Sequence, residues 1–361
     1  MTRIKKAILT GGGRATRLRP ITSTINKHLV PLANKPMIFH AIERVVEAGI
    51  EEIYINVNPE ENQLQKYVGD GGHWGVKITY YVQEGGPQGV AHVVKCAERF
   101  IGDDPFLFYL SDNVISQSLQ PFVDAFHASS DHCRLAFTPV PDPERSGVPR
   151  FDSAGKLLEI IEKPAQPPCN LIMTGIMLYG PKVFFEAYRH LNKSARGEYE
   201  ISAVNTYLLQ HGYRVGHEEI GWWRDTGLAP DLLSANTFLL DAKPASEFIV
   251  ESNIPSGATL TDRVALGVGT TVTPDVIIHG PAIIGPNCTL EHCTIGPYVT
   301  VGNGTTIKHA TITNSIIFSN CLIDSPIHIT DSLIGESVVV KQEPARTKHR
   351  IIVGDHTHIT H

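Results

Sequence analysis

The 361-residue sequence has no long apolar run, and no block of like charge stands out in it. No uninterrupted apolar stretch approaches the ~20 residues that a membrane-spanning helix needs, so a transmembrane protein is excluded. Lys and Arg total 31 against 37 Asp and Glu, a formal net charge of −6. Without a basic cluster, a general nucleic-acid coat or a binder of membrane surfaces is disfavoured. An anionic ligand would therefore need a local site.

Signals for export and for disulfide bonding are also lacking. Residues 1–9 carry charges but contain no apolar h-region and no small-residue cleavage site, so we expect a cytoplasmic protein. The six cysteines are scattered without C-x-x-C spacing. This indicates reduced, mostly buried thiols rather than a disulfide framework or a zinc site. Cys288 and Cys293 come closest to a pair, and a metal role is disfavoured for them as well.

The periodicity of the apolar residues divides the chain into two parts. From residue 4 to about 243, short apolar runs alternate with segments of helical period, which predicts β-α units on a largely parallel sheet. The predicted strands are 4–10, 52–57, 77–82, 106–110, 134–140, 157–162 and 171–179. The predicted helices are 36–48, 89–100, 181–191, 201–211 and 230–240. We therefore expect a Rossmann-like α/β domain over residues 1–243.

After about residue 254 an aliphatic residue recurs every five or six positions, from Leu260 and Leu266 to Ile334 and Val340. Such hexapeptides resemble the left-handed parallel β-helix, in which each unit forms one flat side of a triangular coil with its aliphatic residue inside. This predicts a second domain over 254–361, after a linker. Because flat sides suit symmetric association, we expect a homo-oligomer, with a trimer slightly favoured over dimer-based forms.

A glycine cluster, Gly11-Gly12-Gly13, follows the first predicted strand. Without Cβ atoms, the backbone N–H groups of such a loop can approach a phosphate closely. The spacing is neither G-x-G-x-x-G nor G-x-x-x-x-G-K-[ST], which disfavours a Rossmann dinucleotide site and a Walker loop. Taken alone, the cluster is as typical of a tight turn as of a phosphate cradle.

Further motifs follow in a fixed order as far as residue 227. They are Thr16-Arg17-Leu18-Arg19-Pro20, Lys27 with Leu29-Val30-Pro31-Leu32, Lys35-Pro36-Met37, Gln83 to Gly89, Leu110-Ser111-Asp112-Asn113, Glu162-Lys163-Pro164, Arg196-Gly197-Glu198 and Trp223-Arg224-Asp225-Thr226-Gly227. In this order the motifs resemble those of the sugar-1-phosphate nucleotidylyltransferases. The appended coil and the segment 352–356 resemble the long thymidylyltransferase branch of that family. One departure is Ala15, where the family has a glycine in a loop one residue shorter.

The resemblance implies transfer of a nucleotidyl group from dTTP to glucose 1-phosphate, giving dTDP-glucose and pyrophosphate. In-line attack on the α-phosphorus passes through a highly anionic transition state, so cations rather than a general base would carry the reaction. The implied catalytic residues are Arg17, Lys27 and Lys163, and the implied cofactor is Mg²⁺ held by Asp112 and Asp225. The implied nucleotide-binding residues are Gly11, Gly12, Gly13, Thr16, Arg17, Gln83, Gly89 and Asp112. Those implied for the sugar phosphate are Gly147, Glu162, Lys163, Gly175 and Arg196.

Several alternatives stay open. UTP presents the same base edge as dTTP to Gln83, so a uridylyltransferase is the first alternative. The coil could add an acyl-transfer activity with a histidine base; the histidines available there are His279, His292 and His309. A non-catalytic regulatory or assembly subunit is the third alternative, with Ala15 as its only support.

Two further features are ambiguous. Trp222 and Trp223 suit either sugar stacking or packing, and the irregular tail histidines His349, His356, His358 and His361 do not define a zinc site.

Overall fold

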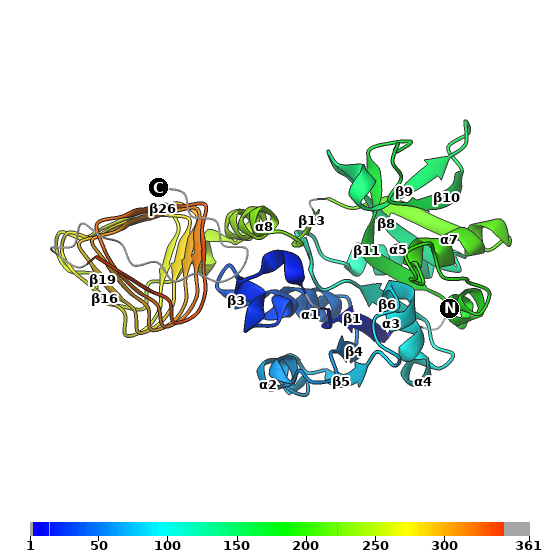
Figure 1. Cartoon of the computed structure of the whole chain (residues 1–361), viewed down its shortest axis with the longest axis horizontal. Coiled ribbons are helices and arrows are strands. Elements are labelled where there is room, and N and C mark those ends of the chain that lie inside the picture. The colour runs from blue at the N-terminus through cyan, green and yellow to red at the C-terminus, as the bar shows by residue number, and fades with distance from the viewer. Residues whose placement is uncertain (1–2, 14, 222, 343–361) are drawn as a thin grey trace. The chain divides into compact units, whose positions relative to one another are not determined.

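The computed structural model describes residues 3–13, 15–221 and 223–342. The chain divides into two compact units (Figure 1). The first unit comprises residues 1–14 and 38–225, and the second comprises 15–37 and 226–361. The segment after the glycine loop thus groups with the C-terminal repeats. The domain limits 1–243 and 254–361, inferred from the sequence pattern, stay predictions.

The first unit is built on a seven-stranded sheet. In spatial order its strands are β12 (Val215–Glu219), β8 (Cys133–Pro139), β11 (Leu171–Tyr179), β6 (Phe106–Tyr109), β1 (Lys6–Thr10), β4 (Glu52–Val57) and β5 (Lys77–Val82). Neighbouring strands are parallel except where β11 pairs with β6 and β8. The predicted Rossmann-like class with a mostly parallel sheet is confirmed.

Helices connect these strands and cover the sheet. They are α1 (Met37–Glu47), α2 (Gln63–Val68), α3 (Val90–Cys96), α4 (Glu98–Ile101), α5 (Gln120–Ala128), α6 (Val183–Tyr188) and α7 (Ile201–Gln210). One hydrophobic cluster joins α3, α6 and α7 to alternate side chains of the central strands, among them Phe106, Phe108 and Tyr179. This rigid packing supports the loops at the carboxyl ends of the strands. The predicted helix 89–100 is divided at Ala97, where α3 ends and α4 begins.

Two short antiparallel ladders complete the first unit. One pairs β7 (Asn113–Ile115) with β13 (Trp223–Asp225), and the other pairs β9 (Gly147–Phe151) with β10 (Leu157–Glu162). Both carry residues from the motifs described above. They bring side chains together that lie far apart in the sequence.

In the second unit the chain forms a parallel coil whose described strands make three five-stranded sheets. The first sheet contains β14 (Thr259–Thr261), β17 (Ile277–His279), β20 (Thr294–Ile295), β23 (Thr311–Thr313) and β26 (His328–Thr330). The second contains β15 (Val264–Leu266), β18 (Ala282–Ile284), β21 (Val299–Val301), β24 (Ser315–Ile317) and β27 (Leu333–Ile334). The third contains β16 (Thr271–Val272), β19 (Thr289–Glu291), β22 (Thr306–Lys308), β25 (Leu322–Asp324) and β28 (Val339–Lys341).

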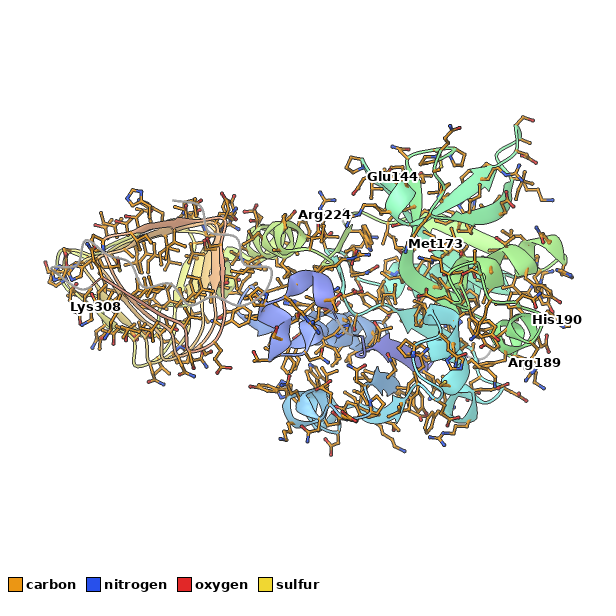
Figure 2. The ribbon with its side chains drawn as sticks, viewed as in Figure 1. Glu144, Met173, Arg189, His190, Arg224 and Lys308 are labelled. Carbon is orange, nitrogen blue, oxygen red and sulfur yellow. The ribbon has the colours of Figure 1, made fainter. Side chains whose placement is uncertain are left out.

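The aliphatic residues of the repeat stack in register inside this coil. Leu260, for example, pairs with Ile278, which in turn pairs with Ile295. Neighbouring side chains point outward (Figure 2), and there Lys308 forms an ion pair with Glu291 at 2.8 Å. Since every coil shields the aliphatic row of the next, the predicted left-handed β-helix architecture is confirmed.

The second unit also contains residues 15–37 and the helix α8 (Ala229–Ala242). Residues 15–37 form short 3₁₀ turns and a hairpin of β2 (Pro31–Leu32) and β3 (Lys35–Pro36). Asn236 of α8 is 1% exposed, and its Oδ1 accepts hydrogen bonds from Ala33 N (2.8 Å) and Thr300 Oγ1 (3.4 Å). This one side chain joins α8, the hairpin turn and strand β21 of the coil.

We expect Asn236→Ala to lower the free energy of unfolding by ~1–3 kcal/mol, because the change removes a buried acceptor from two donors and leaves a cavity. Chemical denaturation measures the loss. Thr237→Ala is the matched control, since it removes only a half-buried contact with Asn314 from the same helix. A variant as stable as the wild type would contradict this role of Asn236.

Candidate active site

The candidate site lies where β1, β4 and β6 end, because the carboxyl ends of parallel strands meet at one edge of a sheet. The turn after β6 is tied to the end of β1 by Ser111, whose N donates to Thr10 Oγ1 at 3.0 Å. The Ser111 hydroxyl also donates to the Thr10 carbonyl. Since Ser111 is 1% exposed, these bonds fix the glycine loop and the Asp112 turn against each other.

The glycine loop is held by two asparagines, Asn56 within strand β4 and Asn58 directly after it. Gly11 N donates to Asn56 Oδ1 (3.1 Å) and Gly13 N donates to Asn58 Oδ1 (3.0 Å). A Cβ on Gly11 would lie 2.8 Å from the Asn56 carbonyl oxygen, so packing against β4 requires glycine there. Two of the N–H groups expected to face a phosphate, those of Gly11 and Gly13, thus bind Asn56 and Asn58. Phosphate binding by Gly11, Gly12 and Gly13 stays a prediction.

The two candidate metal carboxylates meet at the ladder of β7 and β13. Asp225 lies directly opposite Asn113, the residue that follows Asp112. Both carboxylates are half-buried. Asp112 Oδ1 accepts a hydrogen bond from Asn113 Nδ2 at 3.1 Å. The structure thereby brings to one place two aspartates that are separated by more than a hundred positions.

Asn113 is the residue that organises this part of the site. It is 4% exposed, and its Oδ1 accepts hydrogen bonds from Gly175 N (2.9 Å) and Trp223 Nε1 (2.8 Å) while its amide nitrogen binds Asp112. A Cβ on Gly175 would lie 2.7 Å from Asn113 Oδ1, so glycine permits this close approach of β11. Gly175 therefore supports Asn113, which in turn holds the candidate metal carboxylate of Asp112. Its role beside a hexose stays a prediction. Trp222 lies outside the described residues.

The residues expected at the sugar phosphate gather around Glu162 at the end of β10. Glu162 is directly opposite Gly147 in the β9–β10 ladder. Its carboxylate accepts hydrogen bonds from Arg196 Nη2 (3.1 Å) and Ser202 Oγ (2.8 Å). Lys163 Nζ lies 3.9 Å from Glu162 Oε1. Three of the predicted polar side chains, Glu162, Lys163 and Arg196, are thus brought together, and Ser202 is an addition that sequence reasoning missed.

The two cations of this cluster differ in their surroundings. Arg196 donates to both oxygens of Glu200, whose side chain is mostly buried, as well as to Glu162. Partial burial lowers the pKa of Arg196, but its hydrogen bond to Glu200 and the charges of Glu200, Glu162 and Glu198 outweigh burial and raise the pKa overall. Lys163 has a side chain 45% exposed and a backbone φ of 44°, unusual for a residue with a Cβ.

The loop expected to read the base is anchored at both ends. Gln83 Nε2 donates to Gly89 O (3.2 Å) and contacts His92 Nδ1 (3.1 Å). Gly89 has φ 95°, and a Cβ on it would lie 2.6 Å from the Tyr199 carbonyl oxygen. Glycine is therefore required at position 89 by the backbone of residue 199. The expectation that this glycine makes room for a base stays a prediction.

Thr16, Arg17 and Lys27 belong to the second unit, where Thr16 and Arg17 are exposed and Lys27 is half-buried. Ala15 has φ 43° and ψ 40°, the left-handed conformation in which glycine is ordinarily favoured. Its carbonyl accepts a hydrogen bond from Thr22 Oγ1 at 2.7 Å. The backbone thus takes up a glycine-like conformation with alanine in place. The predicted roles of Thr16, Arg17 and Lys27 stay predictions.

The coil histidines lie on its outer turns. His292 Nδ1 contacts Asp275 Oδ2 at 2.5 Å, and the rings of His292 and His309 are stacked with centroids 5.3 Å apart. His279 Nδ1 contacts Thr261 Oγ1 at 2.9 Å. None of these contacts tests the acyl-transfer alternative. The tail histidines 349–361 lie outside the described residues.

All six cysteines are free thiols, and Cys288 and Cys293 are buried in the coil. Burial raises the pKa of Cys293 to about 12, which keeps this thiol protonated. Across residues 3–13, 15–221 and 223–342, no group of three or more histidine, cysteine or acidic side chains is arranged to hold a metal ion. Over the same stretches, no helix has the length and apolar character that crossing a membrane requires.

Comparisons with known proteins agree with this architecture. A model of the family described as nucleotidyl transferase matches residues 6–242, and one described as GMPPB C-terminal domain matches residues 272–361. The chain is 36% identical over 358 residues to a glucose-1-phosphate thymidylyltransferase of Streptomyces antibioticus, covering 98% of this chain and 99% of the relative. It is 35% identical over 359 residues to the low-salt glycan biosynthesis nucleotidyltransferase Agl11 of Haloferax volcanii, with the same coverage of 98% and 99%.

A solved structure agrees as well. A crystal structure described as that of a "putative glucose-1-phosphate thymidylyltransferase" of Bacillus anthracis, in complex with sucrose, has 36% identity and a TM-score of 0.60. The match covers 64% of this chain and 94% of that chain. The chain therefore belongs to the sugar-1-phosphate nucleotidyltransferase family, in the long form that carries a C-terminal β-helix domain.

Proposed function

We propose that this protein transfers a nucleotidyl group from dTTP to glucose 1-phosphate, forming dTDP-glucose and releasing pyrophosphate. The observation that carries the proposal is the convergence of Asp112, Asn113 and Asp225 at the edge of the sheet, beside the glycine loop. Family membership supports the reaction class. The names of two relatives, of S. antibioticus and B. anthracis, support the thymidylyl and glucose specificity.

The carboxylate pair suits Mg²⁺. This ion prefers hard oxygen ligands and is ordinarily bound through one or two carboxylates together with substrate phosphates and water. Asp112 and Asp225 supply that donor set, and Asn113 fixes the orientation of the first carboxylate through its amide nitrogen. When bound, the ion would offset charge that develops on the phosphates during in-line displacement.

The protein's own groups would then position the two substrates. Lys163 and Arg196 present positive charge beside Glu162, which can accept hydrogen bonds from sugar hydroxyls. The sugar phosphate held there attacks the α-phosphorus, and pyrophosphate leaves on the opposite side. Arg17 and Lys27 would meet the triphosphate, Arg17 through its planar fork and Lys27 as a point charge. A general base has little to do, because the attacking phosphate oxygen is already ionised.

The preference for dTTP over UTP is the most specific part of the proposal. The alternative function is uridylyl transfer from UTP. The two bases differ by one methyl group, worth ~1–3 kcal/mol in an apolar pocket, so preference should be ~10- to 200-fold at best. The ribose 2′-hydroxyl adds a separate contribution. Including dUTP in the measurement separates the methyl group from the sugar.

Pyrophosphate release tests the proposal. The full-length protein is assayed with dTTP, UTP, dUTP, ATP and GTP against glucose 1-phosphate and other sugar 1-phosphates at one Mg²⁺ concentration. We expect the highest kcat/KM for dTTP with glucose 1-phosphate, and poor turnover of purines. A higher value for UTP would favour uridylyl transfer, and no release with any pair would favour a non-catalytic subunit.

The flat sides of the β-helix also support self-association, and we expect a homo-oligomer with a trimer slightly favoured. Light scattering of the full chain at micromolar concentration measures its mass. Truncation near Ala245 should change the oligomeric state more than the chemistry. A monomeric full-length chain would contradict this expectation.

A further inference from the structure

The side-chain amide nitrogen of Gln83 has two hydrogen-bond partners. Gly89 O lies 3.2 Å from Gln83 Nε2, and a carbonyl oxygen can only accept, so the amide nitrogen and not the oxygen faces it. The second partner is His92 Nδ1, 3.1 Å from the same nitrogen. Because Nε2 is a donor, His92 Nδ1 must be the acceptor, which requires a neutral ring with its proton on Nε2. Both amide hydrogens are then used, and Oε1 is the group that remains for a ligand.

His92 is held in the state that this contact needs. Its ring stacks on Tyr199 with centroids 6.2 Å apart and lies 6.5 Å from Tyr188. Cys96, one turn further along α3, places its sulfur 3.9 Å from both ring nitrogens. Burial lowers the pKa of His92, the charges of Lys193 and Lys95 lower it further, and Glu84 acts in the opposite sense. The neutral ring therefore prevails at pH 7.

A freely rotating carboxamide could turn over and present either its donor or its acceptor. Turning Gln83 over would place Oε1 against the Gly89 carbonyl, an acceptor that repels it, and would oblige the His92 ring to move its proton from Nε2 to Nδ1. Thymine and uracil carry a hydrogen on N3, and their edge requires an acceptor. Cytosine carries a lone pair on N3 and requires a donor. The orientation of one amide therefore separates these two groups of pyrimidines.

We propose that His92 is a positioning residue that fixes Gln83 with its oxygen toward the base, so that the site selects pyrimidines with an N3 hydrogen and rejects cytosine. The inference rests on the proposed function and on the prediction from the sequence that Gln83 reads the base. It adds a residue, His92, that would act on the nucleotide only through its contact with Gln83.

The experiment compares kcat/KM for dTTP and dCTP with glucose 1-phosphate in the wild type and in two variants. His92→Phe keeps an aromatic ring for stacking on Tyr199 but removes the acceptor. We expect its dTTP-to-dCTP ratio to fall ~10-fold or more, mainly through a higher KM for dTTP and a lower KM for dCTP. His92→Asn is the matched control, because its side-chain oxygen can take the place of Nδ1, and its ratio should stay within ~3-fold of the wild type.

If His92 had only a structural role, His92→Phe would lower kcat/KM equally for dTTP and dCTP, and the dTTP-to-dCTP ratio would not change. His92→Asn would then restore no activity. That result overturns the inference while the wild-type turnover of dTTP leaves the proposed function standing. No turnover of dTTP or UTP by the wild type overturns both. Thermal melting accompanies each variant, and His92→Leu replaces His92→Phe in the same comparison if the larger ring prevents folding.

Discussion

Replacing Asp112 by asparagine should remove most of the nucleotidyl transfer while leaving the fold intact. The neutral amide is a poor ligand for a divalent cation, and loss of one strong electrostatic contact at a transition state commonly lowers kcat by roughly 10²- to 10³-fold. The half-buried side chain keeps its shape, and the new amide oxygen can still accept from Asn113 Nδ2. The thermal midpoint should therefore shift little.

Steady-state kinetics over a series of Mg²⁺ concentrations tests this expectation. We expect the loss mainly in kcat, with the Mg²⁺ requirement moved to higher concentration. Asp124→Asn is the matched control, since Asp124 lies on α5 and accepts an exposed hydrogen bond from Gln120. The metal assignment fails if Asp112→Asn turns over saturating dTTP at a near wild-type rate in ordinary Mg²⁺.

Strong periodic signals explain why much of the fold is predictable from the sequence. The strands Glu52–Val57, Lys77–Val82, Leu157–Glu162 and Leu171–Tyr179 have the predicted limits, because each is an apolar run bounded by polar or turn residues. Each strand of the coil contains one of the aliphatic residues of the repeat. Helix α5 was not predicted, although Phe122, Val123 and Phe126 are buried at helical spacing and could have indicated it.

The remaining parts of the fold and of the candidate site depend on segments too short to show a periodic pattern of apolar residues. Strands β7 and β13 have three residues each, so neither shows the alternation that identifies a strand. The links from Asn56 to Gly11 and from Asn113 to Gly175 are single polar contacts between distant segments. Such contacts leave no pattern in one sequence. The motifs therefore indicated which residues matter at the candidate site, while Asn56, Asn58, His92 and Ser202, and the contacts that Asn113 makes, emerged only from the fold.

The sugar-phosphate cluster raises the question of which cation provides the net charge for an incoming phosphate. Arg196 lies within 4 Å of three carboxylates, those of Glu162, Glu198 and Glu200, so much of its charge is already compensated. Lys163 approaches Glu162 only to 3.9 Å. The backbone of Lys163 has the left-handed conformation, which is strained for a residue with a Cβ. Such strain is typical of functional sites. We infer that Lys163 is the principal phosphate-binding cation and that Arg196 mainly orients Glu162.

Lys163→Met should accordingly raise the KM for glucose 1-phosphate ~10- to 100-fold, because a charged hydrogen bond to the phosphate contributes ~1.5–3 kcal/mol. Methionine keeps the unbranched length and the same backbone constraint, so the comparison isolates the charge. The KM for dTTP should change much less. Lys156→Met is the matched control, since Lys156 is exposed in the turn that joins β9 and β10.

Because the Lys163 side chain is 45% exposed, added salt should raise the wild-type KM for the sugar phosphate. That salt dependence should be weaker in Lys163→Met. An unchanged KM for glucose 1-phosphate in this variant, or an equal rise for both substrates, would show that the ammonium does not hold the sugar phosphate.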